Sequence, residues 1–372
     1  MKTIKHPIAF SPAYPLERIA PREDLLFFDI ETTGFSGASS QLYLIGCVYF
    51  DGFGWRLIQW FADTRDCETQ LLDAFFSFMK DFRVLVHFNG DGFDIPYLLK
   101  CCSRLDLSHS FDGIESLDIY KKIKPLRSFL GLESMKQKAV EAFLGVSRED
   151  VYTGGELIDV YRRYLYTGGE DLLHLLLLHN EDDLKGMPAI LPILHYPDAL
   201  SSPFLLRESC LLPREGGAPC LRLLWESPVT VPIPLEKERS PVNLELAENS
   251  LSCLISLRQG ELKYFYPNYE DYYYLPLEDQ AVHKSVGEYV DRSARKKATA
   301  RTCYTRSCGL FLPQFSPLWK PALKEDYSAP LSYTPYKEEL FSKPEISAAY
   351  ARQVLDFVRE TGKRREKTGE PA

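Results

Sequence analysis

The sequence DIETTG at positions 29–34 constrains the fold of this chain more than any other stretch. It follows four apolar residues, 25–28, which are too few for a typical helix and end close to a glycine, so they are expected to form a buried strand. Side chains two residues apart in a strand point to the same face, which places Asp29 and Glu31 side by side. Adjacent carboxylates repel each other unless a cation lies between them. The pair therefore predicts a divalent-metal site at the end of a strand.

Two later blocks of polar residues complete the pattern. The sequence FNGDGFDIPYL at positions 88–98 follows a second strand-like run and contains the acidic candidate Asp94. The sequence HNEDD at positions 179–183 lies in a segment with helical character. His179 and Asp183 are four residues apart and therefore share one face of that helix. Each block alone is a weak signal, but three in this order are a strong one.

The three blocks resemble, in order, the three motifs of the DEDD (DnaQ-like) 3′–5′ exonuclease superfamily. More narrowly, the chain resembles the YprB-type ribonuclease H-like proteins, because the segments LDIY, EAFLG and GGEL at positions 117–120, 141–145 and 154–157 also fit that group. The resemblance spans roughly residues 20–195. It implies an α/β fold with a ribonuclease H-like mixed sheet flanked by helices. It also implies a 3′–5′ exonuclease that hydrolyses the phosphodiester bonds of nucleic acid. For the rest of the chain, strand-like alternation predicts a smaller β-rich C-terminal module of unknown family.

The resemblance assigns roles residue by residue. The four acidic metal-binding positions are Asp29, Glu31, Asp94 and Asp183, and the general-base position is His179. Substrate contacts are expected at Thr32, Gly34 and Asn89. Two Mg²⁺ or Mn²⁺ ions are the implied cofactors, because hard oxygen ligands suit these metals and a two-metal site acts on both the attacking and the leaving oxygen of a phosphodiester.

One departure concerns the base. Family members with a histidine base usually place it five residues before the last aspartate, and those with tyrosine place it four before. Here His179 stands at the tyrosine spacing and position 178 is leucine. Histidine ordinarily titrates near pH 6.5, which suits a general base, yet the spacing leaves the identity of the base open.

Simpler interpretations exist for several of these residues. Asp94 precedes Pro96 by two positions and could serve as a helix N-cap. Asp183 could lie on an exposed helix face and His179 could be a satisfied structural histidine. Structural roles are expected for three other polar residues, namely His87 in packing, Asp91 in a turn and Asp118 after a strand. At the level of function, the alternatives are an endonuclease acting on structured nucleic acid and a non-catalytic nucleic-acid-binding module on a nuclease fold.

Composition bounds the partners and the compartment. The net charge is −8, so contacts with nucleic acid, whether DNA or RNA, must be local rather than spread over a basic surface. Nine cysteines without a Cys-x-x-Cys pair favour reduced thiols in a cytoplasmic protein. No apolar run is long enough to span a bilayer, and no signal peptide is evident, so no membrane association is expected.

The expected domains are an N-terminal arm (1–20), the exonuclease domain (21–195), a β-rich C-terminal module (200–360) and a disordered tail (361–372). Alternating residues at 252–257 and 261–266 around Gln259-Gly260 predict a hairpin in the module. A tyrosine-rich run is followed by a basic run between positions 292 and 306. These residues either contact nucleic acid or pack a small β module with a solvated charged face, and the pattern does not favour one of the two.

Overall fold

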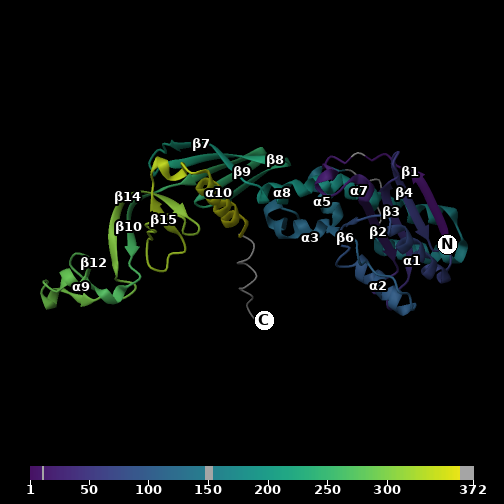
Figure 1. Ribbon diagram of the computed structural model, residues 1–372, viewed down its shortest axis with the longest axis horizontal. Coiled ribbons are helices and arrows are strands. Elements are labelled where there is room, and N and C mark those ends of the chain that lie inside the picture. Colours follow the sequence, from purple (N-terminus) through teal and green to yellow (C-terminus); the bar gives the residue numbers. More distant parts are fainter. Residues whose placement is uncertain (11, 147–153, 361–372) are drawn as a thin grey trace. The chain divides into compact units, whose positions relative to one another are not determined.

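The computed structural model describes residues 1–10, 12–146 and 154–360. The chain divides into two compact units, Met1–Pro197 and Asp198–Ala372, which are described separately below (Figure 1). Among the described residues, no helix combines the length and the apolar character needed to cross a membrane.

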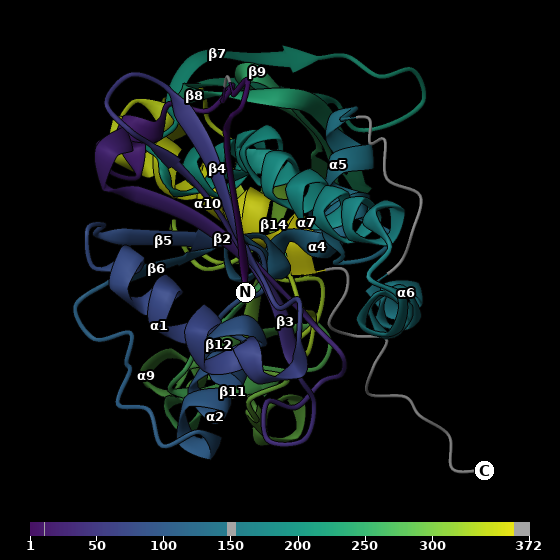
Figure 2. The same ribbon diagram turned by 90° about the vertical axis from the view of Figure 1, so that its right-hand side faces the viewer.

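The first unit is built on a six-stranded mixed sheet with the strand order β1-β4-β3-β2-β5-β6 (Figures 1 and 2). The strands are β1 (Lys2–Pro7), β2 (Leu25–Thr32), β3 (Leu42–Phe50), β4 (Trp55–Phe61), β5 (Val84–His87) and β6 (Glu115–Asp118). Strands β1 to β4 pair antiparallel, whereas β5 is parallel to both β2 and β6. The predicted mixed α/β sheet flanked by helices is therefore confirmed.

Helices cover both faces of this sheet. They are α1 (Glu68–Met79), α2 (Asp94–Arg104), α3 (Ile119–Ile123), α4 (Arg127–Leu130), α5 (Gln137–Leu144), α6 (Gly154–Thr167) and α7 (Glu170–Ile190), with α8 (His195–Ser201) at the boundary of the units. On β2, Phe28 stacks against Phe75 of α1, whereas Asp29 contacts Asn180 of α7. Neighbouring residues of a strand point to opposite faces, so α1 and α7 lie on opposite sides of the sheet.

The centre of the sheet is strongly apolar because it is covered on both sides. The side chains of residues 25–28 in β2 have no exposed area, and all but the last residue of β3 are buried. Fully covered strands of this kind read as continuous apolar runs rather than alternating ones. This explains why the polar residues that end β2 stand out in the sequence.

The sequence predicts an arm at the N-terminus and a disordered tail at the C-terminus, and only the first of these two segments contains residues that the structure describes. Residues 1–20, for which the sequence predicts an extended arm, include strand β1, which pairs along its whole length with β4. The alternation of Lys2 to His6 gives β1 one face toward the unit and one toward solvent, as suits an edge strand. The predicted disordered tail, 361–372, lies outside the described residues, and that prediction stays a prediction.

Among its described residues, the second unit contains three small antiparallel sheets and one long helix. The first sheet contains β7 (Leu205–Leu212), β8 (Cys220–Arg239) and β9 (Val242–Ser256); the second contains β10 (Arg258–Phe265), β14 (Tyr304–Gln314) and β15 (Ser332–Pro335); the third contains β11 (Tyr272–Leu275), β12 (Gln280–His283) and β13 (Lys296–Lys297). Short helix α9 (Lys284–Gly287) follows β12. Helix α10 (Pro344–Arg359) packs on the first sheet, where Trp225 Nε1 donates to Ser347 Oγ at 2.8 Å (Figure 1).

The hairpin predicted around Gln259-Gly260 is wrong. Strand β9 pairs with β8, and β10 pairs with β14, so the two predicted arms belong to different sheets. Gly260 lies inside β10, opposite Gly309, rather than in a turn. Residue alternation identified both strands, but it carries no information about which partner each strand pairs with.

Candidate active site

The acidic residues of the three motifs meet at one cavity of the first unit. This cavity has a volume of about 370 Å³, and the predicted residues that line it are Asp29, Glu31, Asn89, Asp94, His179 and Asp183. They come from β2, from the turn after β5, from the start of α2 and from the middle of α7. Residues that are up to 154 positions apart in the chain (29 to 183) therefore surround a single space.

Strand β2 supplies two of the carboxylates. Asp29 and Glu31 both line the cavity, in agreement with their alternation in the strand. The pairing of β2 with β3 shifts register between Glu31 and Thr32, immediately after this pair. The regular pairing of β2 with β3 therefore ends directly after Glu31.

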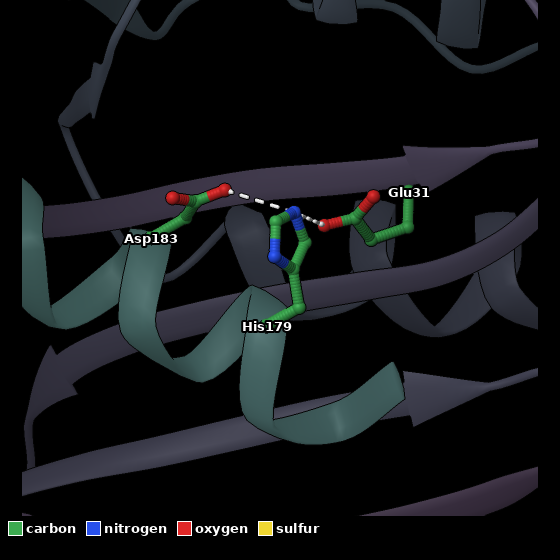
Figure 3. A group of neighbouring side chains, drawn as sticks. All are labelled: Glu31, His179 and Asp183. Carbon is green, nitrogen blue, oxygen red and sulfur yellow. Dashed lines mark ion pairs between the residues drawn. The ribbon is translucent and has the colours of Figure 1, made fainter. Parts of the chain in front are cut away.

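Helix α7 supplies the other half of the site. His179 and Asp183 lie one turn apart, and Figure 3 shows the imidazole of His179 between the carboxylates of Glu31 and Asp183. His179 Nε2 is 3.7 Å from Glu31 Oε1 and 3.5 Å from Asp183 Oδ2. One ligand atom from each of the three residues lies within 4.8 Å of the others. The histidine can therefore exchange protons with this site or bind a cation together with the carboxylates.

The electrostatics of the cavity favour a bound cation. The pKa of Asp29 lies well above its ordinary value, first because the group is buried and then because Glu31, Asp183 and Asp94 repel its charge. Burial likewise raises the pKa of Asp94 to about 7, although hydrogen bonds with the backbone of Asp94 and Ile30 act in the opposite direction. Carboxylates in such surroundings resist ionisation unless positive charge is nearby.

Asp94 does not occupy the cap of its helix. The N-cap position of α2 is Phe93, and Asp94 is the first residue of the helix itself. The interpretation of Asp94 as the N-cap is therefore wrong, because Phe93 holds that position. The Asp94 carboxylate lines the cavity. With only 6% of its surface exposed, Asp94 is a buried acid at a helix start, where the helix dipole favours negative charge.

Two of the three predicted substrate contacts, Thr32 and Gly34, lie outside the cavity. Thr32 ends β2, and its Oγ1 donates a hydrogen bond to the carbonyl of Gly34 at 2.8 Å. Neither residue is among the described residues that line the cavity. Their contact with substrate stays a prediction, whereas Asn89 does line the cavity.

Sequence reasoning missed two residues that hold Asp29 in place. Asn180 is fully buried and donates from Nδ2 to Asp29 Oδ2 at 2.9 Å, while its Oδ1 accepts from Gln59 Nε2 at 2.9 Å. The sequence contains a feature that could have identified each of these two residues. Asn180 lies three residues before Asp183 on the same helix, and Gln59 is an amide inside an otherwise apolar stretch of β4.

The start of α5 was also missed. Lys136, Gln137 and Lys138 line the cavity, and both lysine side chains are exposed. Gln137 Nε2 donates to the main-chain oxygen of Asp183 and to Glu141 Oε1, each at 2.9 Å. This amide ties α5 to α7, so the two flanking lysines are held beside the acidic residues.

The match to a family model concerns the first unit. Residues 26–194 match a family model of the RNase_H superfamily. A DNA polymerase of Thermococcus kodakarensis is 28% identical over 186 residues, a match that covers 40% of this chain and 11% of that protein. For a DNA polymerase of Thermococcus sp. (strain 9oN-7), the identity is also 28% over 186 residues, covering 40% of this chain and 23% of the relative.

Solved structures give weaker likenesses. The family B DNA polymerase of Pyrobaculum calidifontis matches with a TM-score of 0.39 and 17% identity, covering 66% of this chain and 35% of that one. Exonuclease I matches with a TM-score of 0.30 and 11% identity, covering 55% of this chain and 56% of that one.

Together, the sheet order, the flanking helices and the family match define the class of the first unit. Residues 26–194 form a ribonuclease H-like domain. The chain as a whole spans only 11% and 23% of the length of the two polymerases that it matches.

Proposed function

We propose that the first unit is a metal-dependent nuclease that hydrolyses phosphodiester bonds, with 3′–5′ exonuclease polarity. The observation that carries this proposal is the meeting of four carboxylates and a histidine, from three separate motifs, at one cavity. A structural role does not require acids to converge, because neighbouring carboxylates repel one another, and burial together with this repulsion raises the pKa of Asp29.

The residues present fit divalent ions. Asp29, Glu31, Asp94 and Asp183 offer only oxygen ligands, which Mg²⁺ and Mn²⁺ prefer. The raised pKa of Asp29 reflects burial and the repulsion of its three acidic neighbours, and a bound cation would relieve that repulsion. When bound, two such ions activate the attacking water and stabilise the leaving oxygen of the phosphodiester.

In this proposal, His179 moves the proton. Its Nε2 atom faces the space between Glu31 and Asp183, where the attacking water would lie, and accepts the proton of that water. The two carboxylates then stabilise the imidazolium that forms. The buried position of His179, with 5% of its surface exposed, fixes the ring for this role.

Residues around the acids suit a nucleic-acid substrate. Lys136 and Lys138 place two exposed cations at the cavity, where they would neutralise phosphates that flank the reacting one. Phe35 is 95% exposed and makes an edge-on contact with Phe93, which lines the cavity, at a ring-centroid distance of 6.4 Å. An exposed ring beside the site would stack on a base of a single strand.

The relatives support the same substrate class. Two proteins that are 28% identical to this chain over 186 residues are named DNA polymerases, which supports DNA as a substrate. We further infer a YprB-type ribonuclease H-like protein, which the LDIY segment at positions 117–120 supports. It joins the end of β6 to the start of α3, next to the motif that carries Asp94.

A cleavage assay tests the proposal. Single-stranded DNA and RNA, each labelled at the 5′ end, are incubated with the protein in Mg²⁺, Mn²⁺ or EDTA. We expect a ladder that shortens from the 3′ end in the presence of either metal, no products in EDTA, and none with Asp29→Asn. The matched control is Asp66→Asn, which neutralises an exposed carboxylate of the same unit and should leave the ladder unchanged.

The other outcomes separate the alternatives. Internal cuts on either strand would replace the exonuclease by an endonuclease. Absence of cleavage together with absence of Mn²⁺ binding by calorimetry would favour a non-catalytic binding module. Comparison of the DNA and RNA ladders identifies the preferred sugar.

A further inference from the structure

The turn that carries the second motif is held by side chains outside the cavity. Residues 89–93 form a tight turn in which Asn89 has a φ of 65°, and the N–H groups of Gly92 and Phe93 both donate to the carbonyl of Asn89, at 2.9 and 3.0 Å. This turn places Asn89 at one end and Asp94 at the other, and both line the cavity. Its shape therefore sets where these two side chains point.

Three successive N–H groups at the start of the turn are bound by two buried side chains. Asp118 accepts from the N–H of Asn89 through Oδ1 at 2.9 Å and from the N–H of Asp91 through Oδ2 at 3.3 Å. His87 Nδ1 accepts from the N–H of Gly90 at 3.0 Å. Asp118 and His87 are 3% and 1% exposed and lie opposite each other in strands β6 and β5.

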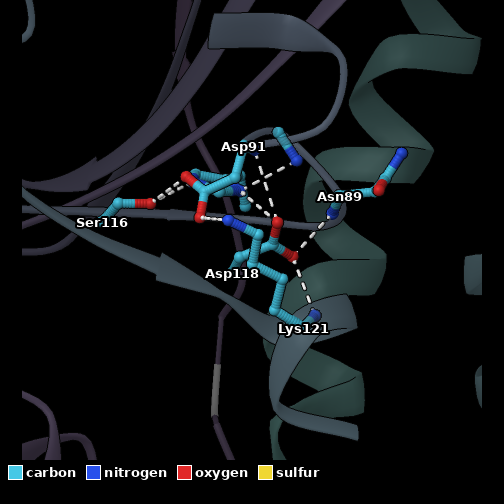
Figure 4. A network of polar contacts seen from close by, with 7 residues as sticks. Asn89, Asp91, Ser116, Asp118 and Lys121 are labelled. Atoms are coloured by element: carbon cyan, nitrogen blue, oxygen red, sulfur yellow. Dashed lines mark hydrogen bonds and ion pairs between the residues drawn. The ribbon is translucent and has the colours of Figure 1, made fainter. Parts of the chain in front are cut away.

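A second layer of contacts holds His87 and also binds the side chain of Asp91 (Figure 4). Because His87 Nδ1 accepts from Gly90, its proton lies on Nε2, which donates to Ser116 Oγ at 2.8 Å. Ser116 in turn donates to Asp91 Oδ1 at 2.5 Å, and Lys121 Nζ donates to Asp91 Oδ2 at 2.7 Å. Every step of the chain has one donor and one acceptor, so the network has a single orientation.

The turn leaves no room for side chains at its glycines. A Cβ atom at Gly90 would lie 2.6 Å from the ring of His87, and one at Gly92 would lie 2.8 Å from Asn89 Oδ1. Glycine at position 90 allows the backbone to approach the ring of His87, and glycine at position 92 allows it to approach the side chain of Asn89. These contacts explain the two glycines of the NGDGFD sequence.

The network itself is not a metal site. His87, Asp91 and Asp118 each offer a ligand atom within 4.8 Å of the others. Lys121 Nζ already supplies a positive charge to Asp91, and both oxygens of Asp118 accept backbone N–H groups. Asp91 is thus paired with a lysine and Asp118 is hydrogen-bonded by the backbone, whereas Asp29 is surrounded by three carboxylates that repel its charge.

We propose that Asp118 is a positioning residue of the active site, which acts with His87 to hold the turn 89–93 so that Asn89 and Asp94 face the other motifs. Asp118 does not line the cavity and touches neither substrate nor metal in this proposal. The proposal rests on the proposed function, because it assigns Asp118 to the same site.

The test compares Asp118→Asn with a matched variant. In Asp118→Asn, one of the two oxygens becomes an NH₂ group that faces a backbone N–H, so at least one hydrogen bond to the turn is lost. The control is Glu68→Gln, since Glu68 is another buried carboxylate of this unit that accepts a backbone N–H, from Leu42 at 3.0 Å, and pairs with Arg104. It has no contact with the turn.

Mn²⁺ titration by calorimetry and amide exchange of the peptide that contains residues 88–98 are measured in both variants and in the wild type. We expect Asp118→Asn to bind Mn²⁺ about 10- to 100-fold more weakly, as is typical when a residue that orients a metal ligand is lost. The amides of the turn should exchange faster. Glu68→Gln should keep the wild-type Mn²⁺ affinity and the wild-type exchange of the turn amides. This should hold even if Glu68→Gln lowers the melting temperature as much as Asp118→Asn does.

Two results would overturn the proposal. One is wild-type Mn²⁺ affinity and wild-type turn exchange in Asp118→Asn. The other is Mn²⁺ binding that survives Asp29→Asn but is lost in Asp118→Asn, which would make Asp118 a ligand. If the wild type itself binds no Mn²⁺, the proposed function fails, and the exchange data alone still decide whether Asp118 holds the turn.

Discussion

Asn180 donates a hydrogen bond of 2.9 Å from Nδ2 to Oδ2 of Asp29, and so links the third motif to the first. The amide cannot turn around, because its Oδ1 accepts from Gln59 Nε2, also at 2.9 Å. Gln59 Nε2 is held in addition by the carbonyl of Leu177. One oxygen of Asp29 is thereby fixed, which sets the direction in which the other can bind a cation.

Asn180→Ala should therefore weaken the site and not only the fold. Removal of the amide leaves Asp29 without its donor and leaves the N–H₂ of Gln59 with one partner fewer. We expect Mn²⁺ affinity to fall about 10- to 100-fold and the free energy of unfolding to fall by about 1–3 kcal/mol. Calorimetry and urea unfolding measure the two effects. Gln314→Ala, which removes a buried amide from the second unit, should lower stability without changing Mn²⁺ affinity.

Gly46 provides the space for this amide. It lies opposite Asp29 in β3, and a Cβ atom there would be 1.9 Å from Asn180 Oδ1 and 2.6 Å from Leu184 Cδ1. Gly46→Ala should push α7 away from the sheet, with a loss of about 1–3 kcal/mol of stability, as is usual for overpacked cores, and with weaker Mn²⁺ binding. Gly54→Ala is the control in the same hairpin, since nothing lies within 4 Å of its Cβ position. Equal melting temperatures of the two variants would contradict this prediction.

Residues that are neighbours along the chain could be placed from the sequence, whereas partners that are distant along the chain could not. Asp29, Glu31, His179 and Asp183 could be placed because strand and helix periodicities fix which neighbours share a face. Asn180 and Gln59 could not be paired in advance, because periodicity does not say which strand a helix crosses. The wrong hairpin near Gly260 has the same origin, since strand partners are chosen by tertiary packing. Lys136 and Lys138 precede or begin a short helix whose docking depends on Gln137.

The pKa of Asp94 predicts how the metal-free protein responds to pH. This pKa rises to about 7 in the folded protein from an ordinary value of 3.8. The folded state therefore binds more protons than the unfolded state between these two values. Stability from this group is fully present below pH 4 and is lost as the pH rises through 7. Thermal unfolding in EDTA should show this fall for the wild type.

Asp94→Asn isolates the contribution of that carboxylate. The amide does not ionise, so the difference in melting temperature between the variant and the wild type should grow in favour of the variant from pH 5 to pH 8. Addition of Mn²⁺ at pH 8 should stabilise the wild type and not the variant. A constant difference across the pH range would show that Asp94 is ionised throughout.

Lys136 and Lys138 should contribute to substrate affinity through local contacts of their charged groups with phosphates. Each phosphate contact to a single strand contributes about 0.7 to the slope of log affinity against log salt concentration. Lys136→Ala/Lys138→Ala should therefore reduce that slope by about 1.4, measured by fluorescence anisotropy of a labelled oligonucleotide in EDTA. Mn²⁺ affinity should stay within twofold or increase slightly, since a repelling charge is lost.

The control for the lysine variant is Lys80→Ala/Lys100→Ala. These residues are two exposed lysines of the same unit that do not line the cavity. The total charge changes equally in the two double variants, so only a local contact can separate them. Identical salt slopes would show that Lys136 and Lys138 act through net charge and do not touch the strand.

The strands and helices that carry the site are spread from β2 to α7, with the supporting Asp118 between them in sequence. No continuous fragment shorter than residues 29–183 contains all four acidic residues that line the cavity. A chain that is still being synthesised therefore lacks the site until α7 has left the ribosome. Nuclease activity in this protein would arise in one step, at the end of the synthesis and folding of the first unit, and partially made chains would be harmless to the nucleic acid around them.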